Sequence, residues 1–336
     1  MGKFVINEWS GLSLSLKGRS HELSGMPCQD SSKFSSENGV YYGILSDGAG
    51  SAKNSDVGSL TVVNVLSKYV SSYFEKIYNE ESVENVRIEI SKLIKSEIQK
   101  VADAERNKIE DYAATAMFVA IKNDRFIIMH LGDGLISYSK NGEIKVASAP
   151  TNGEFINSTI FITSKNIENK INLIKGKLDS IDGFILMSDG TAESFYQRES
   201  KVIAPILNTL LHRSLISSKQ QYTKILKQSF ENTVLRNTKD DCSIVMMCRE
   251  TDNLPNINSI ENYKKYDLFK INTKYNRKKK RLNRLLYIWD FLEKDRNLDE
   301  ISSNIGLPEK YTKKHLNHLL NLGFISKDKN KMYSRK

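Results

Sequence analysis

The chain has 336 residues, of which 39% are hydrophobic and 27% are charged, a composition typical of a globular protein large enough for more than one domain. No segment contains the ~20 uninterrupted apolar residues of a membrane helix, and the first residues lack the apolar core of a secretory signal. The three cysteines form no CxxC pair and no zinc-binding spacing. These features argue against membrane and secreted proteins and predict a cytoplasmic protein.

The net charge of +10 is concentrated at one end of the chain. Residues 276–336 contain 16 Lys and Arg residues against 7 Asp and Glu residues, a charge of +9, which leaves +1 for residues 1–275. Residues 251–276 are polar, rich in asparagine and weakly periodic. We therefore predict a first domain at residues 1–250, a linker at 251–276 and a basic domain at 277–336.

Hydrophobic patterns predict a mixture of strands and helices in the first domain. Alternating leucines predict a strand at residues 12–16, and an apolar run predicts a second at 40–45. Apolar residues at helical spacing predict two long amphipathic helices at residues 56–74 and 83–101. Later strands are expected at residues 116–121, 126–131, 135–138, 144–146, 184–187 and 242–247, and further helices at 203–211 and 222–235. This order indicates an α+β fold or a β-sandwich with helices.

The basic domain has its own pattern of elements. Helices are predicted at residues 282–292, 298–305 and 309–322, and a strand follows from residue 323 through a basic loop to Tyr333. This order resembles the winged-helix domains. The resemblance implies that the third helix and the hairpin present polar and basic side chains to DNA, with protein contacts or dimerisation as the alternative. The outward-facing residues would be Lys310, Thr312, Lys313, Lys314 and Asn317 on the helix and Lys327, Lys329, Lys331 and Arg335 on the hairpin.

Aspartates recur in the first domain at the ends of apolar strands. Four follow apolar runs, usually with a glycine next to them, and a fifth precedes the last strand; they are Asp30, Asp47, Asp133, Asp189 and Asp240. If these strand ends meet at one edge, the carboxylates cannot all stay ionised without cations between them. Mg²⁺ and Mn²⁺, which prefer oxygen ligands, suit such a site. A simple turn is the alternative for any single Asp-Gly pair.

Six short motifs contain these aspartates or lie between them. They are Gly18-x-Ser20-His21 with Cys28-Gln29-Asp30, then Leu45–Gly50, Ala114–Ala116, Gly132-Asp133, Phe184–Gly190 and Asp240–Ile244. In this order they resemble the motifs of the type-2C metal-dependent serine/threonine protein phosphatases, and the resemblance spans residues 10–249. Residues 152–159 are typical of one bacterial branch. The resemblance implies two antiparallel β-sheets in a sandwich flanked by helices, with metals at one end.

The resemblance also implies a site for two Mn²⁺ or Mg²⁺ ions. Asp47 would bridge both ions, and Gly48 would bind one through its carbonyl oxygen. Asp189 and Asp240 would hold the other ion. A metal-bridging hydroxide would then hydrolyse phosphoserine or phosphothreonine in proteins directly. No phosphoenzyme is needed, so Cys28 is expected to pack rather than to react.

Three further residues have looser roles in this resemblance. Asp30 would act mainly through metal-bound water, and Asp133 would serve a third cation that some relatives bind. The first family motif often supplies an arginine that clamps the phosphate, and His21 stands near that place. His21 would contact the phosphate or donate a proton to the leaving oxygen, with an ordinary hydrogen-bonded histidine as the alternative.

Three functions are therefore in play. The first is an active phosphatase, with phosphoprotein substrates and a partner kinase, whose basic domain recruits or regulates it. The second is a DNA-binding regulator whose first domain senses phosphate, metal or a partner without useful catalysis. The third is a scaffold in which both domains only bind proteins.

Overall fold

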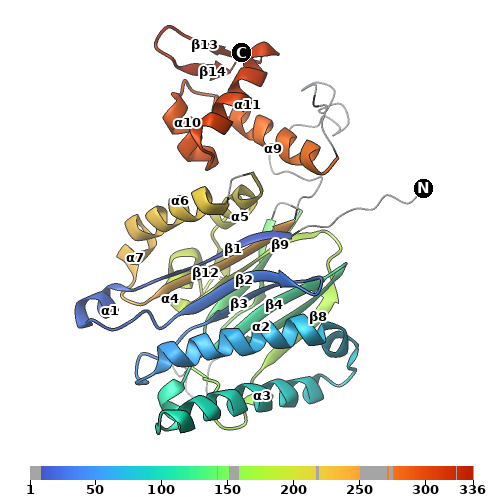
Figure 1. Cartoon of the computed structure of the whole chain (residues 1–336), viewed down its shortest axis with the longest axis vertical. Helices are drawn as coiled ribbons and strands as arrows, with labels where there is room; N and C mark the ends of the chain where they lie inside the picture. The colour runs from blue at the N-terminus through green and yellow to red at the C-terminus, as the bar shows by residue number, and fades with distance from the viewer. Residues whose placement is uncertain are drawn as a thin grey trace. The chain divides into compact units, whose positions relative to one another are not determined.

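The computed structural model describes residues 9–141, 143–150, 159–216, 219–249, 271, 275–322 and 324–335 (Figure 1). Most of the predicted linker, and residues 152–158 of the segment typical of the bacterial branch, lie outside these ranges. Contacts between Cα atoms divide the chain into two units, one made of Gly11–Asn208 and Lys227–Met247 and the other of the remaining segments. Within the described ranges, no helix has both the length and the apolar character required to cross a membrane.

Two five-stranded antiparallel sheets form a sandwich, as predicted. Aromatic and polar contacts join the sheets: the rings of Phe126 and Phe184 lie 5.4 Å apart between centroids, and the hydroxyls of Ser15 and Ser32 lie 2.8 Å apart. The first sheet has the order β1 (Trp9–Leu16), β12 (Cys242–Arg249), β9 (Ile181–Met187), β6 (Leu135–Lys140) and β7 (Glu143–Ser148). The second has the order β2 (Ser31–Glu37), β3 (Val40–Ser46), β4 (Ala116–Lys122), β5 (Arg125–Leu131) and β8 (Asn172–Lys177).

Two long helices, α2 (Ser55–Asn79) and α3 (Val83–Ala104), cover the outer face of the second sheet (Figure 1). Their apolar residues share one buried core with alternate residues of β3, β4 and β5. The Ser82 side chain accepts a hydrogen bond from the N–H of Asn85 and so caps the start of α3. Both predicted amphipathic helices are confirmed, each a few residues longer than expected.

The prediction of a helix at residues 203–211 is wrong at its start. Ile203 lies in a short strand, and the helix begins at Ile206 because Pro205 disfavours helical backbone at the residue before it. The predicted helix at 222–235 is split at Thr233 into two. The shorter elements of this region are α1 (Arg19–Ser24), η1 (Ile109–Tyr112), η2 (Ile167–Asn169), α4 (Asp189–Phe195), β10 (Tyr196–Gln197), β11 (Val202–Ile203), α5 (Ile206–Ile216), α6 (Lys219–Asn232) and α7 (Val234–Asn237).

The basic C-terminal segment forms three helices and a β-hairpin around its own apolar core. The side chain of Asn297 caps the second helix by accepting the N–H of Glu300, and Gly306, with a φ of 63°, ends it. Isolated pairing of Arg296 with Tyr333 joins the start of this helix to the hairpin. The elements are α9 (Tyr275–Phe291), α10 (Leu298–Ile305), α11 (Glu309–Asn321), β13 (Ile325–Lys327) and β14 (Tyr333–Arg335).

One residue of α11 corrects the sequence prediction. Thr312 was expected to face outward, but it is fully buried, and its hydroxyl lies 3.4 Å from the carbonyl oxygen of Leu307. The reason is helical spacing: Thr312 shares the core face with Leu316 and Leu319, four and seven residues later.

Candidate metal centre

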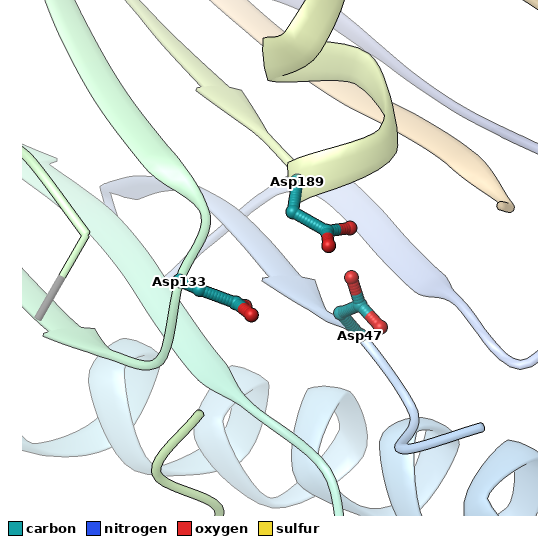
Figure 2. Close-up of side chains that lie close together, drawn as sticks. All are labelled: Asp47, Asp133 and Asp189. Atoms are coloured by element: carbon teal, nitrogen blue, oxygen red, sulfur yellow. The ribbon is translucent and has the colours of Figure 1, made fainter. Parts of the chain in front are cut away.

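Three carboxylates converge where β3, β5 and β9 end. Asp47 follows β3, Asp133 lies in the turn after β5, and Asp189 is the first residue of α4 after β9. One oxygen of each lies within 4.8 Å of the other two, and Figure 2 shows the three side chains pointing toward one another. We call these three residues the acidic cluster. It contains half of the six ligands that the sequence resemblance implies.

Hydrogen bonds to Thr115 hold Asp47 in place. The Oγ1 of Thr115 accepts the N–H of Asp47 at 2.9 Å, and the N–H of Thr115 donates to the carbonyl oxygen of Asp47 at 2.7 Å. The Ser46 hydroxyl donates to the carbonyl oxygen of Thr115 at 2.6 Å. The buried Gly48 follows, and it pairs with Ala114 as an isolated bridge. The pairing of β3 with β4 thus extends to the metal centre and fixes the backbone at Asp47.

A glycine turns the chain sharply just before Asp133. Gly132 has a φ of 123°, and a Cβ atom at this position would lie 2.6 Å from the side chain of Thr115. The carboxylate of Asp133 accepts a hydrogen bond from the hydroxyl of Thr159. Thr115 therefore lies against the backbone on both sides of the cluster.

Two other predicted ligands lie beside the acidic cluster rather than in it. Asp30 is buried, and its Oδ2 has no hydrogen-bond partner within the described residues. Its charge acts on Asp47, as does that of Asp189. Asp240 is exposed, and its charge acts on Asp189. Both therefore border the site electrostatically.

Burial and the repulsion of neighbouring carboxylates raise the pKa values of Asp47 and Asp189. For Asp47 burial is the largest cause, and the charges of Asp30 and Asp189 add to it, so that its pKa lies well above the ordinary value. Burial and the charge of Asp133 raise the pKa of Asp189 to about 6. No lysine, arginine or histidine in the described ranges forms an ion pair with the acidic cluster. Such a set of oxygen donors, lacking a protein cation, fits hard divalent ions.

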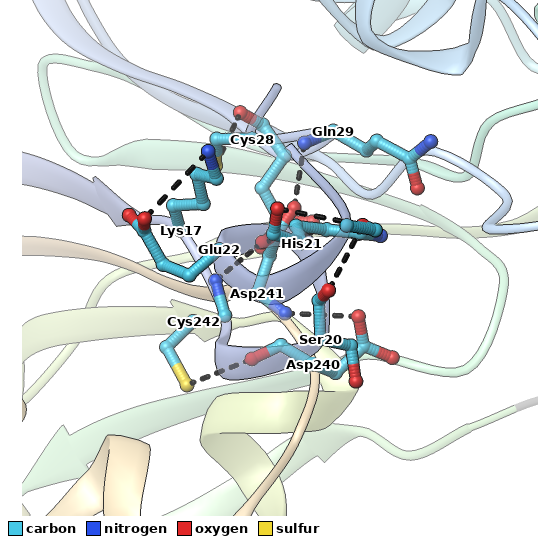
Figure 3. A network of polar contacts seen from close by, with 12 residues as sticks. Lys17, Ser20, His21, Glu22, Cys28, Gln29, Asp240, Asp241 and Cys242 are labelled. Carbon is cyan, nitrogen blue, oxygen red and sulfur yellow. Dashed lines mark hydrogen bonds and ion pairs between the residues drawn. The ribbon is translucent and has the colours of Figure 1, made fainter. Parts of the chain in front are cut away.

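Asp241, next to the predicted ligand Asp240, differs from the acidic cluster because protein donors surround its carboxylate (Figure 3). It is buried, and its Oδ1 accepts the N–H of Gly18 at 2.6 Å and lies 2.9 Å from Nδ1 of His21. Its Oδ2 accepts the N–H of Gln29 at 2.6 Å. We call these contacts the Asp241 clamp. Sequence reasoning missed it because the partners are 212 to 223 residues apart. One signal was available: Asp241 immediately precedes β12, in which every residue except Arg249 is buried.

The cysteine beside the site has no nucleophilic character. The Cys28 thiol is partly buried, and burial together with the charge of Asp241 raises its pKa far above the ordinary value. A thiol nucleophile requires the thiolate form, which this environment disfavours. The expectation that Cys28 packs rather than reacts agrees with this environment.

Most of the predicted nucleic-acid contacts lie on the surface of the C-terminal segment. One of them, Lys313, forms an ion pair with Glu309 at 3.1 Å, and the ammonium of Lys327 lies 5.0 Å from the centroid of the Tyr333 ring. Arg335 is partly buried, with its guanidinium 3.5 Å from the centroid of the Trp289 ring. The exposed residues are Lys310, Lys313, Lys314 and Asn317 on α11 and Lys327, Lys329 and Lys331 at the hairpin.

Comparisons with known proteins agree with this geometry. The sequence model of the family described as "Protein phosphatase 2C" matches residues 17–230. Serine/threonine-protein phosphatase 3 of Escherichia coli (strain K12) is 25% identical over 171 residues, which are 48% of this chain and 66% of that protein, just under two thirds of its length.

Solved structures of bacterial phosphatases share the fold. A bacterial serine phosphatase superposes with a TM-score of 0.52 at 16% identity, over 74% of this chain and 100% of the other. The serine/threonine phosphatase Stp1 from Staphylococcus aureus superposes with a TM-score of 0.50 at 16% identity, over 75% of this chain and 98% of the other. At these identities the likeness shows the fold alone.

Proposed function

The chain belongs to the protein phosphatase 2C family of serine/threonine phosphatases, and we propose that it hydrolyses phosphoserine and phosphothreonine in proteins with the help of two divalent cations. The observation that carries this proposal is the acidic cluster. Its three carboxylates lie within 4.8 Å of one another at the ends of three strands, with no protein cation among the described residues to offset their charge.

Enzymes of this family use two Mn²⁺ or Mg²⁺ ions, and the donors present here fit them. In our proposal Asp47 and the carbonyl oxygen of Gly48 would hold the first ion, and Asp47 would also contact the second. Asp189 and Asp240 would hold the second ion, and the buried Asp30 would act through water. Asp133 would serve a third cation.

The protein's own residues prepare the site for these ions. Thr115 fixes the backbone of Asp47 through two hydrogen bonds, so the point from which the carboxylate extends is set by the protein. Burial keeps bulk water away from Asp30 and strengthens electrostatic interactions there. When bound, the cations would supply a water molecule with a lowered pKa and would offset charge on the phosphoryl oxygens. No covalent enzyme intermediate is required, in keeping with the burial that raises the pKa of the Cys28 thiol.

The test is hydrolysis of a phosphothreonine peptide by the full chain in Mn²⁺, Mg²⁺ or EDTA. We expect turnover that depends on the metal and that Asp189→Asn lowers by more than about 100-fold, beyond the usual cost of losing a partner of a metal ligand. Asp103→Asn, at an exposed position on α3, serves as the matched control and should retain full activity. A folded wild-type protein that is inactive in every metal would overturn the proposal.

We also propose that residues 277–336 form a winged-helix domain, separated from residues 1–250 by a linker, and that this domain binds DNA and so targets or regulates the phosphatase. Its support is the exposure of Lys310, Lys314 and Asn317 along one helix and of Lys327 and Lys329 at the adjoining hairpin. Cations arranged in this way contact phosphates of a duplex, while asparagine reads base edges.

Duplex binding by the full chain at several salt concentrations tests this second proposal. The triple variant Lys310→Ala, Lys313→Ala, Lys314→Ala should reduce the slope of log affinity against log salt by about 3, one per lost phosphate contact. A matched triple variant replaces exposed lysines of α2 and α3, namely Lys68, Lys92 and Lys100, and should keep the slope. Equal slopes in both variants, or no duplex binding, would contradict the proposal.

A further inference from the structure

The segment from Gly18 to Asp30 is an arm held almost entirely by polar contacts. Its helix α1 contains no buried residue, and Leu23 on it is 91% exposed. The arm is nevertheless anchored firmly: the guanidinium of Arg19 donates to the carbonyl oxygen of Thr238, and the N–H of Ser20 donates to that of Lys239 at 3.0 Å. Hydrophobic burial does not explain why this helix lies where it does.

The Asp241 clamp fixes the orientation of one side chain on this arm. Nδ1 of His21 lies 2.9 Å from Oδ1 of Asp241, so the ring nitrogen that faces the carboxylate carries a proton. Within the described ranges Nε2 makes no hydrogen bond to protein, and the side chain is 14% exposed. A buried carboxylate thus presents an imidazole with one nitrogen available to a ligand (Figure 3).

The arm packs directly on the segment that borders the acidic cluster. A Cβ atom on Gly18 would lie 2.3 Å from the carbonyl carbon of Asp240, and a Cβ atom on Gly190 would lie 2.3 Å from the carbonyl oxygen of Asp241. Gly190 follows Asp189 of the acidic cluster. The backbone of the arm therefore packs against residues 240–241. These two residues in turn pack against the start of α4. Asp241, which contacts the ring of His21, therefore lies directly against the residue that follows Asp189.

The contact between His21 and Asp241 is not needed to hold the arm. The backbone N–H groups of Gly18 and Gln29 already donate to both oxygens of Asp241, and Arg19 ties the same helix to residues 236–238. Removing the imidazole would therefore leave six hydrogen bonds of the arm intact, from Gly18, Arg19, Ser20 and Gln29. A role in chemistry accounts for the histidine where anchoring does not.

We propose that His21 is a catalytic residue that donates the proton from Nε2 to the leaving oxygen of phosphoserine or phosphothreonine, with Asp241 as its positioning residue. This inference rests on the proposed function. Attack of water on phosphorus breaks the bond to the serine or threonine oxygen, whose electron pair takes the proton of the imidazolium. The products are the free hydroxyl and inorganic phosphate, and the imidazole regains a proton from solvent.

The leaving group provides the decisive measurement. An alkoxide needs a proton as it departs, whereas 4-nitrophenolate is a stable anion that does not. His21→Ala should therefore lower kcat/KM for a phosphothreonine peptide by about 10²- to 10³-fold and for 4-nitrophenyl phosphate by less than about tenfold. His21→Gln, which donates a hydrogen bond but no proton, should behave as His21→Ala does.

Two measurements that do not depend on catalysis distinguish a proton donor from a phosphate ligand. The affinity for inorganic phosphate, measured by calorimetry with Mn²⁺, should change by less than about threefold in His21→Ala, because a proton donor to the leaving group is not a phosphate ligand. Nitrogen NMR of the imidazole should show a protonated Nδ1 in the wild type and its loss in Asp241→Asn. The control Glu22→Ala, exposed on the same helix, should match the wild type throughout.

Each contrary result has a distinct meaning. Equal losses on both esters, full peptide activity in His21→Gln, or a tenfold loss of phosphate affinity in His21→Ala would each overturn the proton-donor role while leaving the phosphatase intact. A wild-type protein that hydrolyses neither ester would overturn the proposed function and this inference together.

Discussion

The acidic cluster and the Asp241 clamp place carboxylates in opposite surroundings within one site. In the described part of the chain, the three carboxylates of the cluster receive two hydrogen bonds from residues outside the cluster, namely from the hydroxyl of Thr159 and the N–H of Gly190. Asp241 alone receives three. The cluster is therefore incomplete without added positive charge, while the clamp is complete within the protein. The acidic cluster is thus suited to bind cations, whereas the Asp241 clamp holds protein segments together.

The largest expected effect is the loss of turnover when a carboxylate of the acidic cluster is removed. Asp47→Asn should lower metal-dependent turnover by more than about 100-fold, since Asp47 lies at the centre of the carboxylate repulsion. The same change should raise the melting temperature of the metal-free protein, because it removes one of several repelling charges. Kinetics and thermal denaturation in EDTA measure the two effects. A lowered melting temperature without metal would show that the cluster is not under electrostatic strain.

Removing the clamp should act on stability instead. Asp241→Ala leaves the N–H groups of Gly18 and Gln29 without their acceptor, and we expect the free energy of unfolding to fall by about 3 kcal/mol or more. Urea denaturation checks this value. Asp103→Ala, at an exposed position, should stay within about 0.5 kcal/mol of the wild type. A similarly small effect at Asp241 would contradict the distinction between the two regions.

The pH dependence of the metal-free protein should reflect the cluster. A carboxyl whose pKa is raised in the folded state binds its proton more tightly there, so its contribution is present at low pH and is lost as the pH rises. For Asp189, with a pKa of about 6, stability should fall between about pH 4 and pH 6. The decrease should be about 1–3 kcal/mol. Asp189→Asn should flatten this part of the curve, and a stability that rises over the same range would contradict it.

The smallest expected effect concerns the support of Asp47. Thr115→Val removes the acceptor for the N–H of Asp47 and should cost about 1 kcal/mol of stability. Turnover should fall about tenfold, as it does when an outer partner of a metal ligand is lost. Thr115→Ser keeps the oxygen and should restore both properties. Equal behaviour of the two variants would mean that the hydroxyl does not position Asp47.

Local pattern was sufficient for the long helices, the aspartates at strand ends and eight of the ten strands of the two sheets; it did not predict β2 and β8. Amphipathic spacing identifies α2 and α3 because their buried faces repeat along the sequence, and apolar runs ending in Asp-Gly identify the positions of Asp47 and Asp189. The same reasoning found the three helices and the hairpin of the basic segment. These features depend on neighbours in sequence.

The contacts that complete the site could not be predicted in this way. The Asp241 clamp joins residues more than 200 positions apart, and no local periodicity records it. The helix α1 escaped prediction because it buries no apolar face, so it lacks the signal on which helix prediction depends. Thr312 was misplaced because a threonine in a segment with three lysines has a polar appearance, whereas its phase on α11 puts it in the core.

The order of strands in the first sheet has a consequence for synthesis. The first strand, β1, lies beside the last, β12, and residues 240–241 immediately precede that last strand. A nascent chain therefore leaves the ribosome with β1 unpaired and the arm unanchored until more than 200 further residues have followed. Under the proposed function, catalytic competence should therefore appear only when β12 docks, when the protein is nearly finished.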